Sequence, residues 1–327
     1  MEPRHANTLE PIRYVLVTPA RDEAAFIERT IQSIIAQTVL PLRWVIVSDG
    51  STDATEAIVE KYTPQYPWIT LVRMPNRRER HFGGKVEAFN AGYQALNGMN
   101  YDFIGNLDGD LSLGADYFEY LLEKLAKDPR LGVVGTNYME NGTLKYDFRF
   151  TNIEDVAGAC QLFRRRCFEQ IGGYKPNRDG GVDLFATLSA RMCGWQTRTF
   201  TDKSFLHHRP SGTAKVSRLL VEYHNGRKDY CFGCHPLWQP FRALYRLTKR
   251  PWIIGGCLLL IGYFWAMLTR TPKCVSKDIA RFRRLEQMRR LRQFFRNLMQ
   301  NPLKFLLGVG CSSSHWFESL EKPLSML

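Results

Sequence analysis

Short β-branched segments alternate with amphipathic segments over residues 14–138, and this alternation restricts the fold more than any other feature of the sequence. The expected strands are YVLVTPA (14–20), LRWVIVS (42–48), ITLVRM (69–74), YDFIGNLDGD (101–110) and LGVVGTNY (131–138). The expected helices lie between them, at residues 23–38, 52–62, 85–96 and 115–127. Strands that alternate with helices of this length predict right-handed βαβ units. We therefore expect an α/β fold with a Rossmann-like, mixed but mainly parallel sheet flanked by helices.

Acidic residues fall at the carboxyl ends of two of these expected strands. Asp49 is at the end of the second strand, and Asp108 and Asp110 are at the end of the fourth. Ligands of parallel sheets bind outside the carboxyl ends of the strands, so these carboxylates are expected to meet at one crevice. Two carboxylates one residue apart offer the oxygen ligands that suit Mg²⁺ or Mn²⁺. Lys85 follows two glycines and could meet a phosphate.

The sequence Asp-Gly between apolar residues also signals a tight hairpin turn. This interpretation of residues 106–113 requires a returning strand, but the following segment, 115–127, has the pattern of a helix. We therefore expect a site and not a hairpin here, with Gly109 permitting close approach of a nucleotide.

Charge divides the chain into two expected regions, a domain at 1–210 and a basic helical region at 211–327. Residues 1–206 hold 24 Lys and Arg against 26 Asp and Glu, and the remaining residues hold 21 against 6. A nucleic-acid binder more often spreads its basic residues over the recognition domain, so we expect no nucleic-acid partner. A basic appendage on a near-neutral domain favours an anionic membrane surface.

Two segments of the basic region have the composition of membrane-associated helices. Residues 252–268 are uncharged and reach the lower limit of a bilayer span, so they could span, lie in plane or be buried. Residues 277–299 predict an amphipathic helix with a dense arginine face, typical of a helix on an anionic membrane. The first residues lack the pattern of a secretory signal, so we expect the cytoplasmic face of the cell membrane.

The cysteines show no spacing typical of a disulfide framework. CFGCH at residues 231–235 matches a haem-attachment pattern, but that attachment requires export. A zinc site on Cys231 and Cys234 would need two further ligands, and His235 is one candidate only. Neither group is expected.

Several ordered motifs resemble those of the family 2 glycosyltransferases. Three segments are similar to the nucleotide-binding segments of that family: VTPARDEAAFIERTIQSIIAQT, VIVSDGSTDAT and GGKVEAFNAG. A fourth, NLDGDLSL, is similar to its metal-binding Asp-x-Asp motif. The segment that closes the donor site in that family resembles GACQLFRRRCFEQIGGY. The segment that supplies the acceptor base resembles GGVDLFATLSARMCGW. The resemblance covers roughly residues 12–210 and implies an inverting enzyme with the GT-A (nucleotide-diphospho-sugar transferase) fold.

The resemblance implies a set of donor-binding residues. Pro19, Arg21 and Glu23 would belong to the first nucleotide loop, where Arg21 replaces the usual Tyr. Asp49 would accept a hydrogen bond from the uracil edge, and Lys85 would lie near the nucleotide.

The resemblance also implies the metal ligands and the catalytic base. Asp108 would serve the ribose and the metal shell, and Asp110 would bind the Mg²⁺ or Mn²⁺ that bridges the two phosphates. His207 and His208 lie where many members offer a histidine to the metal or phosphate, and both are candidates. Asp183 would be the general base that deprotonates the acceptor hydroxyl.

The expected activity is metal-dependent transfer of a sugar, most simply from a UDP-sugar, to a lipid-linked or cell-envelope polysaccharide acceptor. The chain lacks the Gln-x-x-Arg-Trp motif of processive synthases, which favours single additions. The alternative acceptor is polyprenyl phosphate. A sugar-nucleotide pyrophosphorylase would open with a Gly-rich loop, and TPARDEAA contains no glycine. If the protein were a non-enzymatic membrane or nucleic-acid scaffold, there would be no common function for its four site aspartates, which are Asp49, Asp108, Asp110 and Asp183.

Overall fold

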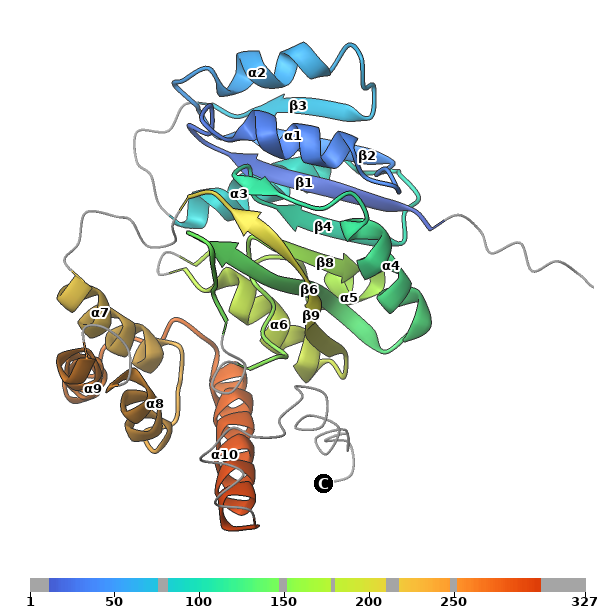
Figure 1. Ribbon diagram of the computed structural model, residues 1–327. Helices are drawn as coiled ribbons and strands as arrows, with labels where there is room; N and C mark the ends of the chain where they lie inside the picture. The colour runs from blue at the N-terminus through green and yellow to red at the C-terminus, as the bar shows by residue number, and fades with distance from the viewer. Residues whose placement is uncertain are drawn as a thin grey trace, which may run out of the picture. The chain divides into compact units, whose positions relative to one another are not determined.

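The computed structural model describes residues 12–75, 82–146, 152–177, 180–209, 218–247 and 252–300. They form two units, one made of the described residues up to 209 and the other of those from 218 onward (Figure 1). The expected boundary at 210 and 211 lies outside the described residues.

One curled sheet organises the first unit. Its strands are β1 (Tyr14–Ala20), β2 (Arg43–Ser48), β3 (Ile69–Arg73), β4 (Phe103–Leu107), β5 (Leu111–Ser112), β6 (Leu131–Glu140), β7 (Thr143–Leu144), β8 (Cys160–Arg164) and β9 (Gln196–His207). The strand order is β3-β2-β1-β4-β8-β6-β9-β5, and β7 pairs with β6. The four strands from β3 to β4 are parallel, whereas β8 lies antiparallel between β4 and β6. The mixed α/β architecture expected from the sequence is confirmed.

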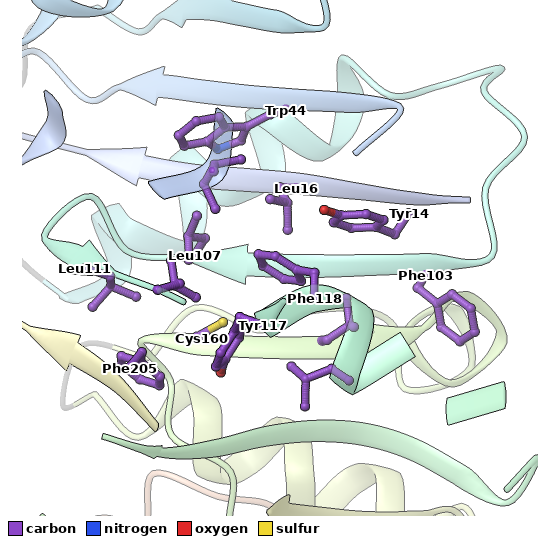
Figure 2. Close-up of a cluster of buried hydrophobic side chains, with 14 of the residues drawn as sticks. Tyr14, Leu16, Trp44, Phe103, Leu107, Leu111, Tyr117, Phe118, Cys160 and Phe205 are labelled. Carbon is purple, nitrogen blue, oxygen red and sulfur yellow. The ribbon is translucent and has the colours of Figure 1, made fainter. Parts of the chain in front are cut away.

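Helices cover both faces of this sheet (Figure 1). They are α1 (Ile27–Ile35), α2 (Thr55–Tyr62), α3 (Phe82–Gln94), α4 (Tyr117–Lys127), α5 (Arg165–Gln170) and α6 (Val182–Met192). Successive residues of a strand point to opposite faces, so Tyr14 and Leu16 pack with α1 and α4 in the core shown in Figure 2. Val15 and Val17 pack with α3 on the other face. Burial on both faces explains why β1 is apolar almost throughout.

The acidic turn after β4 is not a hairpin, in agreement with the sequence interpretation. β5 begins immediately after Asp110, but it pairs antiparallel with β9, where Leu111 lies opposite His207. β4 instead pairs with β1 and β8. The turn therefore joins two strands that lie far apart in the sheet, and it brings the end of β9 to the carboxyl end of β4.

The second unit consists of helices α7 (Arg218–Cys231), α8 (Trp238–Leu247), α9 (Trp252–Leu268) and α10 (Lys277–Gln300). α7 packs closely on α9, because the α-carbon of Gly226 faces the carbonyl of Leu259 and that of Gly262 faces the carbonyl of Tyr223. Among the described residues, no helix combines the length and the apolar character that a bilayer crossing needs.

The CFGCH segment lies between the end of α7 and the start of α8, and it contacts α10. The thiol of Cys234 is buried and accepts a hydrogen bond from Nε2 of Gln287 at 3.2 Å. The backbone N–H of His235 donates to Oε1 of the same Gln287 at 2.8 Å, and Arg284 donates to the carbonyl of Gly233 at 3.1 Å. These contacts give the segment a structural role in holding α10.

Candidate active site

Loops that follow β1 and β2 are tied together by hydrogen bonds. Oδ1 of Asp22 accepts from the backbone N–H of Thr52 at 2.8 Å, and the N–H of Glu23 donates to Oγ1 of Thr55 at 2.8 Å. Asp22 has a positive φ of 55°, a conformation that aspartate adopts more readily than most residues. The two loops therefore form one rim at the carboxyl ends of neighbouring parallel strands.

Three of the expected nucleotide-binding residues lie on this rim. Pro19 is half-buried within β1 and Arg21 is half-buried in the loop that follows. Asp49 is buried directly after β2, where its N–H donates to the carbonyl of Ala20 at 2.8 Å. These residues and the end of β4 lie at the same edge of the sheet, because β1 lies between β2 and β4.

Gly109 separates the two aspartates of the acidic turn. A Cβ at this position would lie 3.1 Å from Cδ1 of Ile27 and 3.3 Å from Cγ of Glu23. The carbonyl of Gly109 accepts a hydrogen bond from Oγ1 of Thr30 at 2.9 Å. The start of α1 therefore occupies the space that a side chain at position 109 would need.

Asp108, Asp110 and His207 form a group that could hold a metal ion. Each of them offers one ligand atom, and these atoms all lie within 4.8 Å of one another. Nε2 of His207 lies 3.4 Å from Oδ1 of Asp110. Two carboxylate oxygens and one imidazole nitrogen form a donor set that fits Mn²⁺ or Mg²⁺, since both cations accept such ligands together with water and phosphate oxygens.

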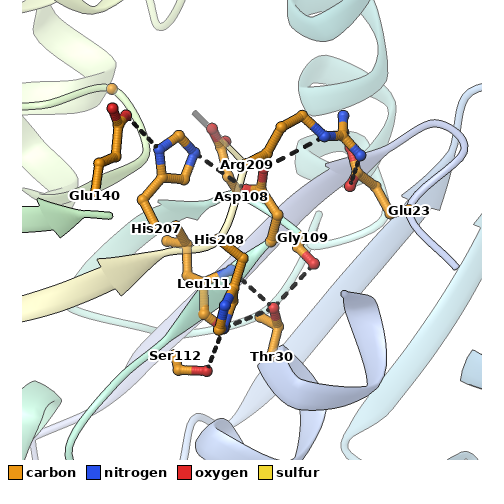
Figure 3. Close-up of polar contacts among 12 residues, drawn as sticks. Glu23, Thr30, Asp108, Gly109, Leu111, Ser112, Glu140, His207, His208 and Arg209 are labelled. Carbon is orange, nitrogen blue, oxygen red and sulfur yellow. Dashed lines mark hydrogen bonds and ion pairs between the residues drawn. The ribbon is translucent and has the colours of Figure 1, made fainter. Parts of the chain in front are cut away.

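The other nitrogen of His207 is held by a buried carboxylate, as Figure 3 shows. Nδ1 lies 3.1 Å from Oε1 of Glu140, whose side chain is only 3% exposed. Oε2 of Glu140 accepts from Nζ of Lys145 at 2.5 Å. Burial lowers the pKa of His207, but the hydrogen bonds to Asp110 and Glu140 outweigh this effect and raise that pKa. The sequence analysis missed Glu140, which stands at the end of a strand without any motif.

His208 points away from the metal-binding group. Its Nε2 lies 2.7 Å from Oγ of Ser112, and its ring stacks on Phe26 with 5.8 Å between centroids. Consecutive residues of an extended chain project to opposite sides, so only one of the two histidines can face the aspartates. The structure places His207 there.

Glu23 and Arg209 form an ion pair beside Asp110. The guanidinium donates to Oε1 at 3.0 Å and to Oε2 at 2.6 Å, and its Nε lies 4.0 Å from Oδ2 of Asp110. Burial raises the pKa of Glu23 to about 7, and Asp110 adds to this rise while Arg209 opposes it. The sequence analysis missed Arg209, although it follows the two histidines directly.

A cavity of about 340 Å³ adjoins the metal-binding group. Four of the expected site residues line it: Lys85, Asp108, Asp183 and His207. The described lining does not include the other expected residues of the nucleotide loops and the acidic turn, which are Pro19, Arg21, Glu23, Asp49 and Asp110. Nζ of Lys85 contacts Oδ1 of Asp108 at 2.5 Å. Burial lowers the pKa of Lys85, but Asp108 and its neighbours outweigh this effect and raise it, so the ammonium stays charged. The volume is within the range of small-molecule sites.

Asp183 lies in the first turn of α6, which begins after two glycines with positive φ, Gly180 at 79° and Gly181 at 74°. Gly158 packs directly against its carboxylate, because a Cβ there would stand 2.8 Å from both Cβ and Oδ2 of Asp183. This close backbone contact fixes the position of the Asp183 side chain in the cavity wall.

Comparison with known proteins shows which proteins this chain is similar to. Residues 15–172 match the protein family described as Glycosyl transferase family 2. The chain is 33% identical to the hyaluronan synthase of Pasteurella multocida over 202 residues, which are 58% of this chain and 20% of that protein. It is 29% identical to the poly-β-1,6-N-acetyl-D-glucosamine synthase of Staphylococcus aureus over 133 residues, 41% of this chain and 30% of that protein. The chain thus spans less than a third of the length of these relatives.

Solved structures have the same fold. The mannosyltransferase PcManGT from Pyrobaculum calidifontis, in complex with GDP-Man and Mn²⁺, gives a TM-score of 0.51 at 21% identity, covering 82% of this chain and 77% of that one. Residues 1–349 of S. aureus TarS, in complex with UDP-GlcNAc, give 0.52 at 14% identity, covering 77% and 72%. The fold is that of GT-A glycosyltransferases, as the sequence resemblance implied.

Proposed function

We propose, from the premise that residues 15–172 are a glycosyltransferase family 2 domain, that the protein transfers a sugar from a nucleotide-diphospho-sugar to a hydroxyl group of a saccharide acceptor. One observation carries the proposal. Asp108 and His207 of the metal-binding group line the same cavity as Asp183. A nucleotide-sugar whose phosphates lie at the metal-binding group would therefore hold its sugar within reach of Asp183, the proposed base.

The donor would lie with its diphosphate at the metal-binding group and its base along the rim formed by the loops after β1 and β2. A divalent cation held by Asp108, Asp110 and His207 would neutralise charge that develops on the departing diphosphate. Lys85, charged and adjacent to Asp108, would bind the same phosphates. Asp49 would contact the nucleobase, which on the family resemblance is uracil.

Asp183 would act as the general base. Its carboxylate takes the proton from the acceptor hydroxyl while the hydroxyl oxygen bonds to the anomeric carbon. The bond from that carbon to the donor phosphate breaks at the same time, and the nucleoside diphosphate leaves. A single displacement of this kind inverts the anomeric configuration.

A saccharide acceptor is supported by the relatives, which are named as synthases of hyaluronan and of poly-β-1,6-N-acetyl-D-glucosamine. We propose a lipid-linked or cell-envelope saccharide that is extended by single additions. The basic helical unit favours a second candidate acceptor, polyprenyl phosphate, because residues 207–327 hold 21 basic against 6 acidic residues. Parallel assays with a lipid-linked saccharide and with polyprenyl phosphate separate the two acceptors.

We further propose that the protein works at the cytoplasmic face of a membrane. Several large apolar side chains of α9 are exposed, among them Ile253, Ile254 and Trp265. The basic helix α10 follows α9 in the chain, and exposed apolar side chains together with basic ones favour binding to an anionic lipid surface.

The donor assignment is tested by thermal shift of the full chain with UDP-, GDP- and dTDP-sugars, each with and without Mn²⁺. We expect one nucleotide to stabilise the protein and the stabilisation to require the cation. If no nucleotide sugar raises the melting temperature with Mn²⁺ present, the proposed donor class is wrong.

A further inference from the structure

A second cavity, of about 690 Å³, lies within the helical unit beside the first turns of α10. We propose that it binds the phosphate group of an anionic membrane lipid. This inference rests on the proposed membrane attachment and not on the chemistry of sugar transfer. Lys273, Lys277, Arg281 and Arg284 line the cavity together with His235, and no acidic side chain belongs to its described lining.

Helical spacing brings three of these cations onto one side of α10. Lys277, Arg281 and Arg284 stand at intervals of four and three residues, so their side chains lie above one another along the same face. Like charges at this spacing repel one another when nothing lies between them. Such an arrangement is favourable when an anion occupies the space that they share.

Two of the four cations, Lys273 and Arg284, donate hydrogen bonds to backbone carbonyls of the helical unit. Nζ of Lys273 donates to the carbonyl of Tyr230 at 2.6 Å, and Nε of Arg284 donates to the carbonyl of Gly233 at 3.1 Å. Burial, followed by the charge of Arg284, lowers the pKa of Lys273 to about 8. These two side chains therefore fix the floor of the cavity and give it a positive potential.

The other two cations face the cavity without such partners. Lys277 and Arg281 are exposed, and no ion pair or hydrogen bond engages their side-chain nitrogens within the described residues. A guanidinium and an ammonium one helical turn apart can bind the same phosphate, and charge-assisted hydrogen bonds of this kind are strong. They are the groups that we expect to contact the ligand.

The remaining wall of the cavity is aliphatic, and this feature favours a lipid over free phosphate. Val275, Leu285 and Met288 line it next to the cations. Leu285 is 54% exposed, so its side chain is accessible to a ligand in the cavity. A phosphate ester that carries hydrocarbon chains satisfies both parts of the cavity at once.

The test compares two double variants of the full chain that lose the same charge. Lys277→Gln with Arg281→Gln removes the free cations of the cavity, and Arg292→Gln with Arg296→Gln removes two exposed arginines of the same helix outside it. Binding to phosphatidylcholine vesicles with and without phosphatidylglycerol is measured by sedimentation. We expect the cavity variant to lose about ten-fold more affinity for phosphatidylglycerol vesicles than the control, since general attraction to the surface falls equally in both.

Equal losses in the two variants would overturn the proposal, because general electrostatics would then explain the binding. Saturation by inorganic phosphate together with unchanged vesicle binding would also overturn it, since the site would then take free phosphate. The proposal would also be overturned if the cavity variant lost binding to an RNA oligonucleotide but kept binding to the vesicles. Mn²⁺-dependent release of nucleoside diphosphate, measured without vesicles, should be the same in both variants, so a failure of the lipid site is distinguishable from a failure of the proposed activity.

Discussion

The carboxylate of Glu140 and the imidazole of His207 are joined by a hydrogen bond of 3.1 Å between Oε1 and Nδ1. Lys145 binds the second oxygen of Glu140. The Glu140 carboxylate accepts the proton of Nδ1, so a neutral ring offers the lone pair of Nε2 to a metal ion. A carboxylate that orients a histidine in this way fixes both the tautomer and the ring of a metal ligand. Glu140 is therefore a positioning residue of the proposed metal site.

Replacing Glu140 by Ala should weaken Mn²⁺ binding by about 10- to 100-fold, because His207 loses the partner that sets its tautomer. Isothermal titration with Mn²⁺ measures the change. Glu140→Gln should recover part of the affinity, since its amide oxygen can still accept from Nδ1. Equal metal affinity in the Ala variant and the parent protein, with both folded, would show that Glu140 has no such role.

The two neighbouring histidines should respond differently to substitution. His207→Ala removes a ligand and should abolish measurable Mn²⁺ binding at concentrations that saturate the parent protein. His208→Ala should leave metal affinity unchanged and lower the free energy of unfolding by about 1 kcal/mol, because the hydrogen bond to Ser112 is lost. Electron paramagnetic resonance of bound Mn²⁺ distinguishes the two variants. Loss of the signal in His208→Ala would contradict the proposed ligand set.

A methyl group at Gly158 should displace the proposed base. Gly158→Ala places Cβ within 2.8 Å of Asp183, so the carboxylate or the backbone must shift. We expect kcat to fall by about 100-fold, the size of effect that a misplacement of about 1 Å produces. Donor affinity should change little, because the metal-binding group is untouched.

Gly114→Ala is the matched control, since the nearest atom to its added Cβ is an exposed carboxylate oxygen at 3.7 Å. A normal kcat in Gly158→Ala, with the protein folded, would argue against Asp183 as the base.

Local sequence signals predict the first half of the sheet well. The segments from β1 to β4 are apolar runs followed by helices, and each of these features is visible within a short window. The placement of β8 is different, because its pairing joins Phe103 to Arg164 and inserts an antiparallel strand between β4 and β6. No short window contains both partners, so this part of the topology comes from long-range packing.

The candidate site follows the same division. The Asp-Gly-Asp turn is visible because its residues are adjacent in the sequence, and the strand pattern places it at a carboxyl end. Choosing between His207 and His208 requires the register of β9 on β5, where Leu111 lies opposite His207. Finding Glu140 requires the pairing of β6 with β9, which includes an irregularity between Thr136 and Asn137. Neither register is encoded in a local motif.

The central claim is that Asp108, Asp110 and His207 hold the cation on which sugar transfer depends. It is tested most directly by measuring Mn²⁺-dependent release of nucleoside diphosphate from the preferred donor, before and after EDTA, in the parent protein and in Asp110→Asn. Asp116→Asn, which changes an exposed aspartate outside the site, is the control. We predict that EDTA abolishes release and that Asp110→Asn lowers it by at least about 100-fold while the control stays active. Undiminished Mn²⁺-dependent release by a folded Asp110→Asn variant would contradict the claim.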